Sequence, residues 1–371
     1  MDCSFVRQFD RRKLLGVGAT GLATLAGCAG VLGSSGPQMA DDWTTRVPRT
    51  TGGLAAQEGT AYVATADGLE TVDVETGDQG WEFSTGNRNA STRPVVTGDT
   101  VYVGTFAGPD RSPRLYAIST GGVEAWSVGL PGGVTTPAVT DRTVFAASGV
   151  MGGADGLSAF DAASGDEAWS VSLDDHPVGS SPVVAGETVY LESGGFAAFD
   201  AATGDLEWRR EREETEIGEA ARYGPVVGDD TVYFSYSMGT EVDAFDRETG
   251  ERQWTAEVNA RATQPVLADG TLYVGTTNYS PDEPDGRLYA LDPSTGDELW
   301  SVSTGDVPLE GPVHRDGTVY TAGFDTLYAV QDGKISWRER FDNEISAPVP
   351  AGEHLLLDTP TGDSHTLYGL R

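Results

Sequence analysis

Few residues in this chain are of the types that carry out chemistry, and they are scattered. Histidine and cysteine supply many of the catalytic bases, nucleophiles and metal ligands of proteins. The chain contains no G-x-S-x-G, H-E-x-x-H or P-loop motif. Its four histidines show no spacing that would place two of them on one metal ion: His176, His314, His354 and His365. We interpret these histidines as surface or channel side chains and not as catalysts.

One acidic segment offers the oxygen ligands that a hard cation such as calcium prefers. The segment NYSPDEPDGR, residues 278–287, carries Asp282, Glu283 and Asp285. Acidic residues are frequent along the whole chain, so a solvated loop is the simpler interpretation. A cation site at these three residues is the alternative.

The sequence consists largely of one repeat, and the strands of this repeat must position the histidines and the acidic segment. Eight tryptophans recur at intervals of 37 to 46 residues: Trp43, Trp81, Trp126, Trp169, Trp208, Trp254, Trp300 and Trp337. Each copy holds an apolar stretch, an alternating segment such as TVYVGT, a third segment such as RLYALD, and the tryptophan segment. The apolar stretch begins with Pro in every copy except the first, which starts near Leu54. Alternation of Thr, Val and Tyr favours half-buried strands, and the intervening TGD and ADG tripeptides favour tight turns. An Asp also precedes the turn that leads to the tryptophan segment in five copies: Asp73, Asp161, Asp200, Asp246 and Asp292. Because this Asp recurs with the turn, we interpret it as a turn residue and not as a metal ligand.

Four-stranded units at this period are typical of propeller blades. The copies number eight, but the last, residues 347–371, has three strands and no tryptophan after it. The segment DDWTTRV, residues 41–47, supplies the missing strand. We therefore predict an all-β, eight-bladed β-propeller of four-stranded antiparallel blades over residues 41–371, closed by an N-terminal strand that completes the last blade. The repetition predicts that all eight tryptophans dock between neighbouring blades.

A ligand of such a ring would bind in the central channel. The residues just before the Pro-led strands are expected at one mouth of it: Arg93, Thr136, Ser181, Gly224, Gln264, Gly311 and Ala347. With Arg93, the residues Arg222 and Arg261 are candidates for a cationic ring that binds a cofactor. The alternative is that these arginines pair with local carboxylates. The set contains no convergent catalytic group, so no catalytic residue is assigned.

The segment LYALDPSTGDELW, residues 288–300, resembles the tryptophan-docking repeat of the pyrroloquinoline-quinone (PQQ) propeller superfamily. The resemblance covers about residues 41 to 371 and implies the fold, because the motif is architectural. It implies two possible functions: PQQ- and calcium-dependent alcohol oxidation, or non-enzymatic assembly of the kind performed by BamB-type lipoproteins. The dehydrogenases are longer and typically carry a disulfide of adjacent cysteines. None of their cofactor ligands can be matched here, so the chain is more similar to the BamB-type group.

The N-terminus indicates export. DRRKLLG, residues 10–16, resembles a twin-arginine signal, and LAGC, residues 25–28, resembles a lipobox with Cys28 as the lipidated residue. We expect a signal peptide at residues 1–27, a flexible tether at residues 28–40, and a location on the extracytoplasmic face of the cell membrane. The only other cysteine, Cys3, lies within the signal, so the mature chain would have no disulfide.

The net charge of the chain indicates that the protein is adapted to a solution of high salt concentration. The formal charge is −33, and removal of residues 1–27 leaves 20 basic and 55 acidic residues, a charge of −35. The acidic residues are spread along the chain, as in haloarchaeal secreted proteins that are soluble at high salt. Such a surface is a poor partner for nucleic acid. The membrane is expected to be contacted only through the lipid anchor, and the ring is expected to be a monomer.

The sequence as a whole favours a lipid-anchored propeller that acts as a non-catalytic binding or assembly scaffold for protein partners. No cofactor is predicted. A PQQ-dependent dehydrogenase or quinone-binding protein with calcium is the first alternative, and a propeller that binds extracellular glycan or substrate is the second. The partner is not identified by the sequence.

Overall fold

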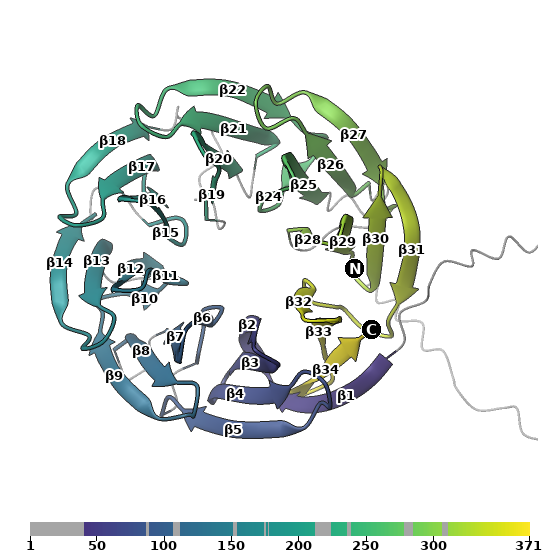
Figure 1. The fold of residues 1–371 in the computed structure, drawn as a ribbon, viewed down its shortest axis with the longest axis horizontal. Helices are drawn as coiled ribbons and strands as arrows, with labels where there is room; N and C mark the ends of the chain where they lie inside the picture. The colour runs from purple at the N-terminus through teal and green to yellow at the C-terminus, as the bar shows by residue number, and fades with distance from the viewer. Residues whose placement is uncertain are drawn as a thin grey trace, which may run out of the picture. The chain divides into compact units, whose positions relative to one another are not determined.

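The computed structural model describes residues 41–86, 89–106, 112–150, 154–173, 176, 178–211, 224–235, 239–277, 285–305 and 311–371. Within these residues all regular structure is β: strands β1 to β34 form eight antiparallel sheets, arranged as blades around a channel (Figure 1). This confirms the predicted eight-bladed propeller. In this part of the chain no helix is long and apolar enough to cross a membrane. The predicted signal, tether and Cys28 lie outside the described residues.

The first four blades follow one another along the chain, each running from an inner strand to an outer strand. Blade 1 contains β2 (Thr50–Gln57), β3 (Thr60–Thr65), β4 (Gly68–Asp73) and β5 (Gln79–Ser84). Blade 2 contains β6 (Val95–Thr97), β7 (Thr100–Gly104), β8 (Arg114–Ser119) and β9 (Glu124–Gly129). Blade 3 contains β10 (Gly133–Val134), β11 (Ala138–Val139), β12 (Thr143–Val150), β13 (Gly156–Asp161) and β14 (Glu167–Ser172). Blade 4 contains β15 (Val183–Ala185), β16 (Thr188–Glu192), β17 (Gly195–Asp200) and β18 (Leu206–Glu211).

The remaining blades continue in the same order, and only blade 8 takes a strand from elsewhere. Blade 5 contains β19 (Val226–Val227), β20 (Thr231–Ser235), β21 (Glu241–Asp246) and β22 (Arg252–Glu257). Blade 6 contains β23 (Arg261–Ala262), β24 (Val266–Ala268), β25 (Thr271–Thr277), β26 (Arg287–Leu291) and β27 (Glu298–Ser303). Blade 7 contains β28 (Val313–Arg315), β29 (Thr318–Ala322), β30 (Thr326–Gln331) and β31 (Lys334–Arg340). Blade 8 contains β32 (Val349–Ala351), β33 (His354–Pro360), β34 (Ser364–Leu370) and β1 (Asp41–Pro48).

In blades 3 and 6 the inner strand is split into two short pieces, and both pieces pair with the second strand. Blade 8 is closed as predicted, because β1 pairs antiparallel with β34 from Asp41↔Leu370 to Pro48↔Ser364. The first and last segments of the ring therefore share one sheet, and no covalent link joins them there. We call the junction between blade 8 and blade 1, together with this strand pair, the seam.

The apolar core is divided among the junctions between blades. Eight clusters of buried side chains each join residues of two neighbouring blades. At the seam, for example, Trp43 and Leu356 of blade 8 pack with Val63 of blade 1. Burial of apolar surface is the main favourable term in folding, so each blade is stabilised chiefly by its two neighbours.

The tryptophans pack at these junctions. Six of them donate the indole N–H to a backbone carbonyl oxygen of the next blade, at 2.7 to 3.1 Å: Trp43, Trp81, Trp126, Trp169, Trp208 and Trp254. Trp300 and Trp337 lie 5.9 and 6.2 Å, between ring centroids, from Tyr273 and Tyr320 of their own blades. An aromatic ring with a polar edge suits a junction where apolar packing meets backbone carbonyls.

The recurrent Asp of the turn before the tryptophan strand caps that turn. Asp200, for example, accepts the backbone N–H groups of Ala202 and Thr203 at 2.9 and 2.8 Å. These hydrogen bonds hold the pKa of the Asp200 carboxyl below its usual value, chiefly through the Thr203 backbone N–H. The same lowering of the pKa, from equivalent bonds, occurs at Asp73, Asp161, Asp246 and Asp292. The turn interpretation of these residues is therefore correct.

Candidate functional site: the channel mouth

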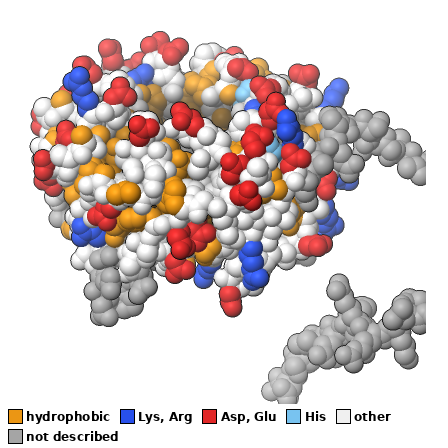
Figure 2. Space-filling view, turned by 60° about the horizontal axis from the view of Figure 1, so that its bottom comes forward, with side chains coloured by type: hydrophobic (Ala, Val, Ile, Leu, Met, Phe, Trp, Pro, Cys, Tyr) orange, Lys and Arg blue, Asp and Glu red, His pale blue; other side chains and the backbone are white. Residues whose placement is uncertain are grey.

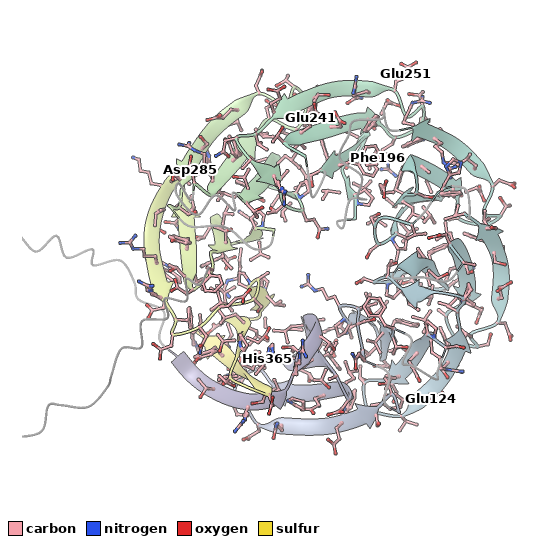
Figure 3. The ribbon with its side chains drawn as sticks, turned by 180° about the vertical axis from the view of Figure 1, so that it is seen from behind. Glu124, Phe196, Glu241, Glu251, Asp285 and His365 are labelled. Carbon is pink, nitrogen blue, oxygen red and sulfur yellow. The ribbon has the colours of Figure 1, made fainter. Side chains whose placement is uncertain are left out.

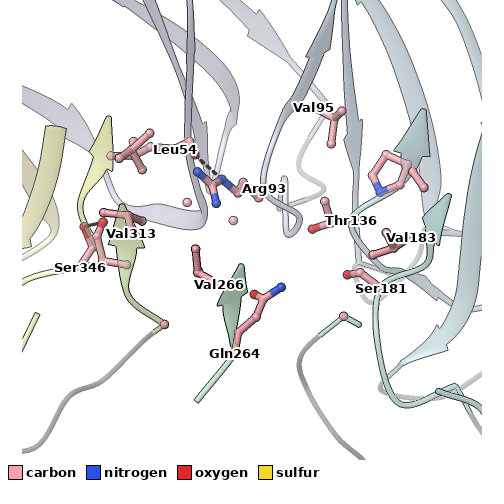
Figure 4. Close-up of a pocket in the computed structure, with 18 of the residues that line it drawn as sticks. Leu54, Arg93, Val95, Thr136, Ser181, Val183, Gln264, Val266, Val313 and Ser346 are labelled. Carbon is pink, nitrogen blue, oxygen red and sulfur yellow. Dashed lines mark hydrogen bonds between the residues drawn. The ribbon is translucent and has the colours of Figure 1, made fainter. Parts of the chain in front are cut away.

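The inner strands of the blades surround a cavity of about 820 Å³ at one mouth of the channel (Figure 4). The seven residues that precede the Pro-led strands all line it: Arg93, Thr136, Ser181, Gly224, Gln264, Gly311 and Ala347. Pro residues and small apolar side chains of the same strands form much of the remaining wall. The repeat places one residue of each of these seven copies at the channel wall, so the sequence spacing was sufficient to predict their position.

Of the two candidate arginines in the described part of the chain, only Arg93 lines the mouth. Arg93 lines the mouth, and its Nε donates to the backbone oxygen of Leu54 in blade 1 at 2.8 Å. Arg261 pairs in β23 with Thr277 and is not among the residues that line the cavity. Arg222 lies outside the described residues. Among the described candidates, Arg93 alone contributes a positive charge to the mouth, so these residues do not form a cationic ring.

A buried carboxylate at the mouth was missed by the sequence analysis. Asp358 of β33 lines the cavity and is 5% exposed. Its Oδ2 lies 2.5 Å from Nδ1 of His365 in β34 and accepts the hydroxyl of Thr50, in blade 1, at 2.6 Å. Burial acts to raise the pKa of Asp358, but the hydrogen bonds from His365 and Thr50 outweigh it, so its pKa lies below the usual Asp value.

Comparison of the copies does not single out Asp358. Its backbone N–H donates to Ser346 Oγ at 2.9 Å, in the same way that Gly104 donates to Thr92, Gly275 to Thr263 and Glu192 to Ser180. This position therefore holds glycine in two of these copies and a carboxylate in the other two. The sequence does not show that His365 and Thr50 gather around Asp358.

The Asp358 cluster is a tie between blades 1 and 8. The hydroxyl of Ser346 accepts the Asp358 N–H and donates to the backbone oxygen of Ala347 at 3.3 Å. The hydroxyl of Thr50 contacts both the Asp358 carboxylate and Nδ1 of His365. Thr50 thus connects blade 1 with two side chains of blade 8 across the seam.

Of the three acidic residues in the candidate cation site, the structure describes Asp285. Asp285 accepts from Ser303 Oγ at 2.8 Å and from Arg287 Nε at 3.2 Å, and these bonds, that of Ser303 first, lower its pKa. Figure 3 shows Asp285 and His365 in separate parts of the ring. Asp282 and Glu283 lie outside the described residues. Within the described residues no three His, Cys, Asp or Glu side chains gather closely enough to hold a metal ion.

PQQ is a planar polyanion, so a site for it needs a stacking surface, several donors and usually calcium ligands. No aromatic ring is found among the described residues that line the mouth, where Arg93 is the cation and Asp358 the carboxylate. This set of donors does not fit PQQ with calcium.

The ring, its docked tryptophans and its channel define a β-propeller of the PQQ-like class. The family described as outer membrane protein assembly factor BamB matches residues 37–108, 68–302 and 284–370. The chain therefore belongs to this family.

Individual relatives come from both functional groups. A stretch of 118 residues is 36% identical to BamB of Nitrosomonas eutropha and covers 31% of this chain and 26% of that protein. A stretch of 141 residues is 31% identical to the quinohemoprotein alcohol dehydrogenase of Comamonas testosteroni and covers 31% of this chain and 19% of that protein. The chain thus spans about a quarter or less of the length of these two curated relatives.

Among solved structures, BamB from Moraxella catarrhalis superposes with a TM-score of 0.70 at 17% identity, over 90% of this chain and 100% of that chain. At this identity the likeness supports the fold and nothing further.

Proposed function

We propose that this protein is a non-catalytic scaffold that binds protein partners outside the cytoplasm, held at the membrane by a lipid on Cys28. The observation that carries the proposal is the match of the BamB family to residues 37–370, which is the whole ring. A scaffold uses the ring as a rigid platform, because short strands and docked blades hold the surface loops in fixed positions.

The channel mouth supports a binding role over a catalytic one. It presents backbone, hydroxyl and amide groups from many blades, and its two described charged residues, Arg93 and Asp358, are held by neighbouring blades. Catalysis requires a nucleophile, a base and a group that stabilises developing charge within reach of one another. The described residues of the mouth do not supply this set.

The negative surface charge supports attachment to the membrane through the lipid anchor and not through the ring. Figure 2 shows Asp and Glu side chains over much of the visible face, with fewer Lys and Arg. A formal charge of −33 repels anionic surfaces, so a protein of this kind is drawn to a membrane by its anchor and not by its ring. The twin-arginine pattern at Arg11 and Arg12 and the lipobox ending at Cys28 are the sequence features on which the location rests.

The test is a purification from the membranes of the natural host in molar salt. The full chain, tagged at its C-terminus, is cross-linked in cells and compared with a Cys28→Ala variant, which lacks the lipidated residue. We expect the wild type in the membrane fraction with a stoichiometric protein partner, and the variant released from the membrane. A wild-type chain that is found in the cytoplasm, or that never enriches a partner, would contradict the proposal.

A second candidate function is PQQ-dependent oxidation. It is favoured by the 31% identity to a quinohemoprotein alcohol dehydrogenase over part of the ring. The chemistry of the described donor set argues against it, and the titration in the Discussion distinguishes the two functions.

A further inference from the structure

The seam is the one place where the described ring is closed without a chain connection between strands. β1 enters blade 8 from the N-terminal side, and β34 ends at Leu370, one residue before the C-terminus. Asp41 lies opposite Leu370, so the two ends of the ring meet at the outer edge of blade 8. Whatever holds the first residues of β1 in place therefore holds the ring closed.

A fully buried histidine lies at this point. His354, the first residue of β33, is 0% exposed. Its Nε2 is 3.0 Å from Oδ2 of Asp42 in β1, and its Nδ1 is 3.8 Å from Oε1 of Glu75, in the turn between β4 and β5 of blade 1. One imidazole thus faces a carboxylate of the closing strand and a carboxylate of the neighbouring blade.

The protonated form of the ring matches this arrangement. A neutral imidazole has one N–H and one bare nitrogen, whereas the imidazolium has an N–H on each nitrogen. Nδ1 of His354 is buried and makes no hydrogen bond in the described structure. If Nδ1 carries no proton, it is a hydrogen-bond acceptor that faces another acceptor, the Glu75 carboxylate. A buried polar atom without a hydrogen-bond partner lowers the stability of the fold. Protonation gives both nitrogens an attractive partner.

The other charged groups around His354 do not replace this pairing. Arg315 of β28 donates from Nη1 to the backbone oxygen of His354 at 2.8 Å, so it fixes the main chain. Arg371 contacts Glu353 through Nη2, and its Nη1 is 4.0 Å from Oδ2 of Asp42. The guanidinium of Arg371 is therefore engaged mainly with Glu353, which leaves Asp42 and Glu75 as the carboxylates that face the imidazole.

We propose that His354 is a protonation-dependent clamp that fastens β1, and with it the closure of the ring, more firmly when its imidazole is charged. Because closure then favours the charged form of the imidazole, closure and proton binding are linked, and the clamp is stronger at low pH than at high pH.

The experiment measures hydrogen exchange of the full chain in molar salt between pH 5.5 and 8.5. The protection of β1 is expressed relative to that of β14, the outer strand of blade 3, so that the intrinsic effect of pH on exchange cancels. We expect the relative protection of β1 in the wild type to fall by about tenfold over this range, the lower end of what a hydrogen bond to a charged group contributes. In a His354→Gln variant the relative protection should not change with pH.

Two further variants keep the test decisive. Glu75→Gln retains His354 and changes a mostly exposed side chain, 62% exposed, so it should fold and show a smaller pH effect. His314→Gln removes a histidine that is 3.5 Å from Asp269 at another junction, and it should behave like the wild type. Equal slopes in the wild type, His354→Gln and Glu75→Gln would overturn the proposal, as would a slope that His314→Gln abolishes.

Discussion

Gly77 lies flat against the indole of Trp43, so close that a Cβ on Gly77 would lie 2.7 Å from the ring. Trp43 belongs to β1 and Gly77 to the turn between β4 and β5, so this contact fastens the strand that closes the ring to blade 1. At six other junctions a turn glycine packs in the same way on the tryptophan of the preceding blade, so that a Cβ would lie 2.6 to 3.0 Å from the ring: Gly122, Gly165, Gly204, Gly250, Gly296 and Gly333.

The first prediction concerns this close packing. Gly204→Ala places a methyl group within 2.6 Å of Trp169, whereas Gly98→Ala, which also has a positive φ, meets no atom within 4 Å. The backbone strain of the two substitutions is therefore similar, and the clash is specific to Gly204. We expect Gly204→Ala to lower the free energy of unfolding by about 1–3 kcal/mol more than Gly98→Ala does, which is the usual cost of overpacking. Denaturant unfolding of both variants measures the difference, and equal losses would show that the glycine is needed only for its φ.

The second prediction concerns the closing strand. Trp43 is 9% exposed and is docked on Gly77, whereas no described glycine docks on Trp337, which is more exposed. The next blade after Trp337 is blade 8, where the third strand β34 and the outer strand β1 are not joined by a turn. We expect Trp43→Ala to cost about 3–5 kcal/mol of unfolding free energy, as for a buried aromatic residue, and Trp337→Ala to cost clearly less. A similar loss for both would mean that the seam tryptophan does not depend on its glycine.

The third prediction concerns pH and Asp358. Its pKa is lowered in the folded state, so its contribution to stability is fully present above the pKa of an unfolded Asp, about 3.9. This contribution is lost as pH falls through the lowered value. The difference in melting temperature between the wild type and Asp358→Asn should therefore be largest near pH 6 and shrink toward pH 2. Asp363→Asn, an exposed change in the same blade, is the control and should leave the acid limb of the curve unchanged.

The fourth prediction concerns salt. A formal charge of −33 destabilises a compact chain through self-repulsion, and at 1 M salt the Debye length falls to about 3 Å, which screens that repulsion. We expect the melting temperature of the full chain to rise steadily from dilute buffer to molar sodium or potassium chloride. A midpoint that is constant or falls across the series would refute the expectation of a salt-adapted protein.

The fifth prediction separates the scaffold from the dehydrogenase. Purified chain is titrated with PQQ and calcium in molar salt and then assayed for dye-coupled oxidation of alcohols and sugars. We expect no saturable binding, because the described mouth offers neither a stacking ring nor a set of metal ligands. Micromolar binding with substrate-dependent dye reduction would instead establish the oxidoreductase. In that case Arg93→Ala, which removes the cation at the mouth, should weaken PQQ binding.

The sequence was sufficient for the fold because the fold is a repetition. A tryptophan every 37 to 46 residues, and a turn that carries a Gly in seven copies and a preceding Asp in five, reveal the strands, the blades and their number. The orphan Trp43 and the incomplete last copy predicted the closure that β1 and β34 make. The same periodicity placed residues from Arg93 to Ala347 at the channel mouth, because equal positions in equal blades lie at equal distances from the axis.

Tertiary structure decided what repetition does not encode. His354 and His365 are isolated in the sequence, yet the seam brings Asp42 and Glu75 to the first and Asp358 and Thr50 to the neighbourhood of the second. Asp42, Thr50 and Glu75 are far from both histidines in the sequence, so no local pattern relates them, whereas Asp358 and His365 belong to one hairpin. Burial makes these contacts important, since a polar group removed from water depends on the few partners that the fold supplies.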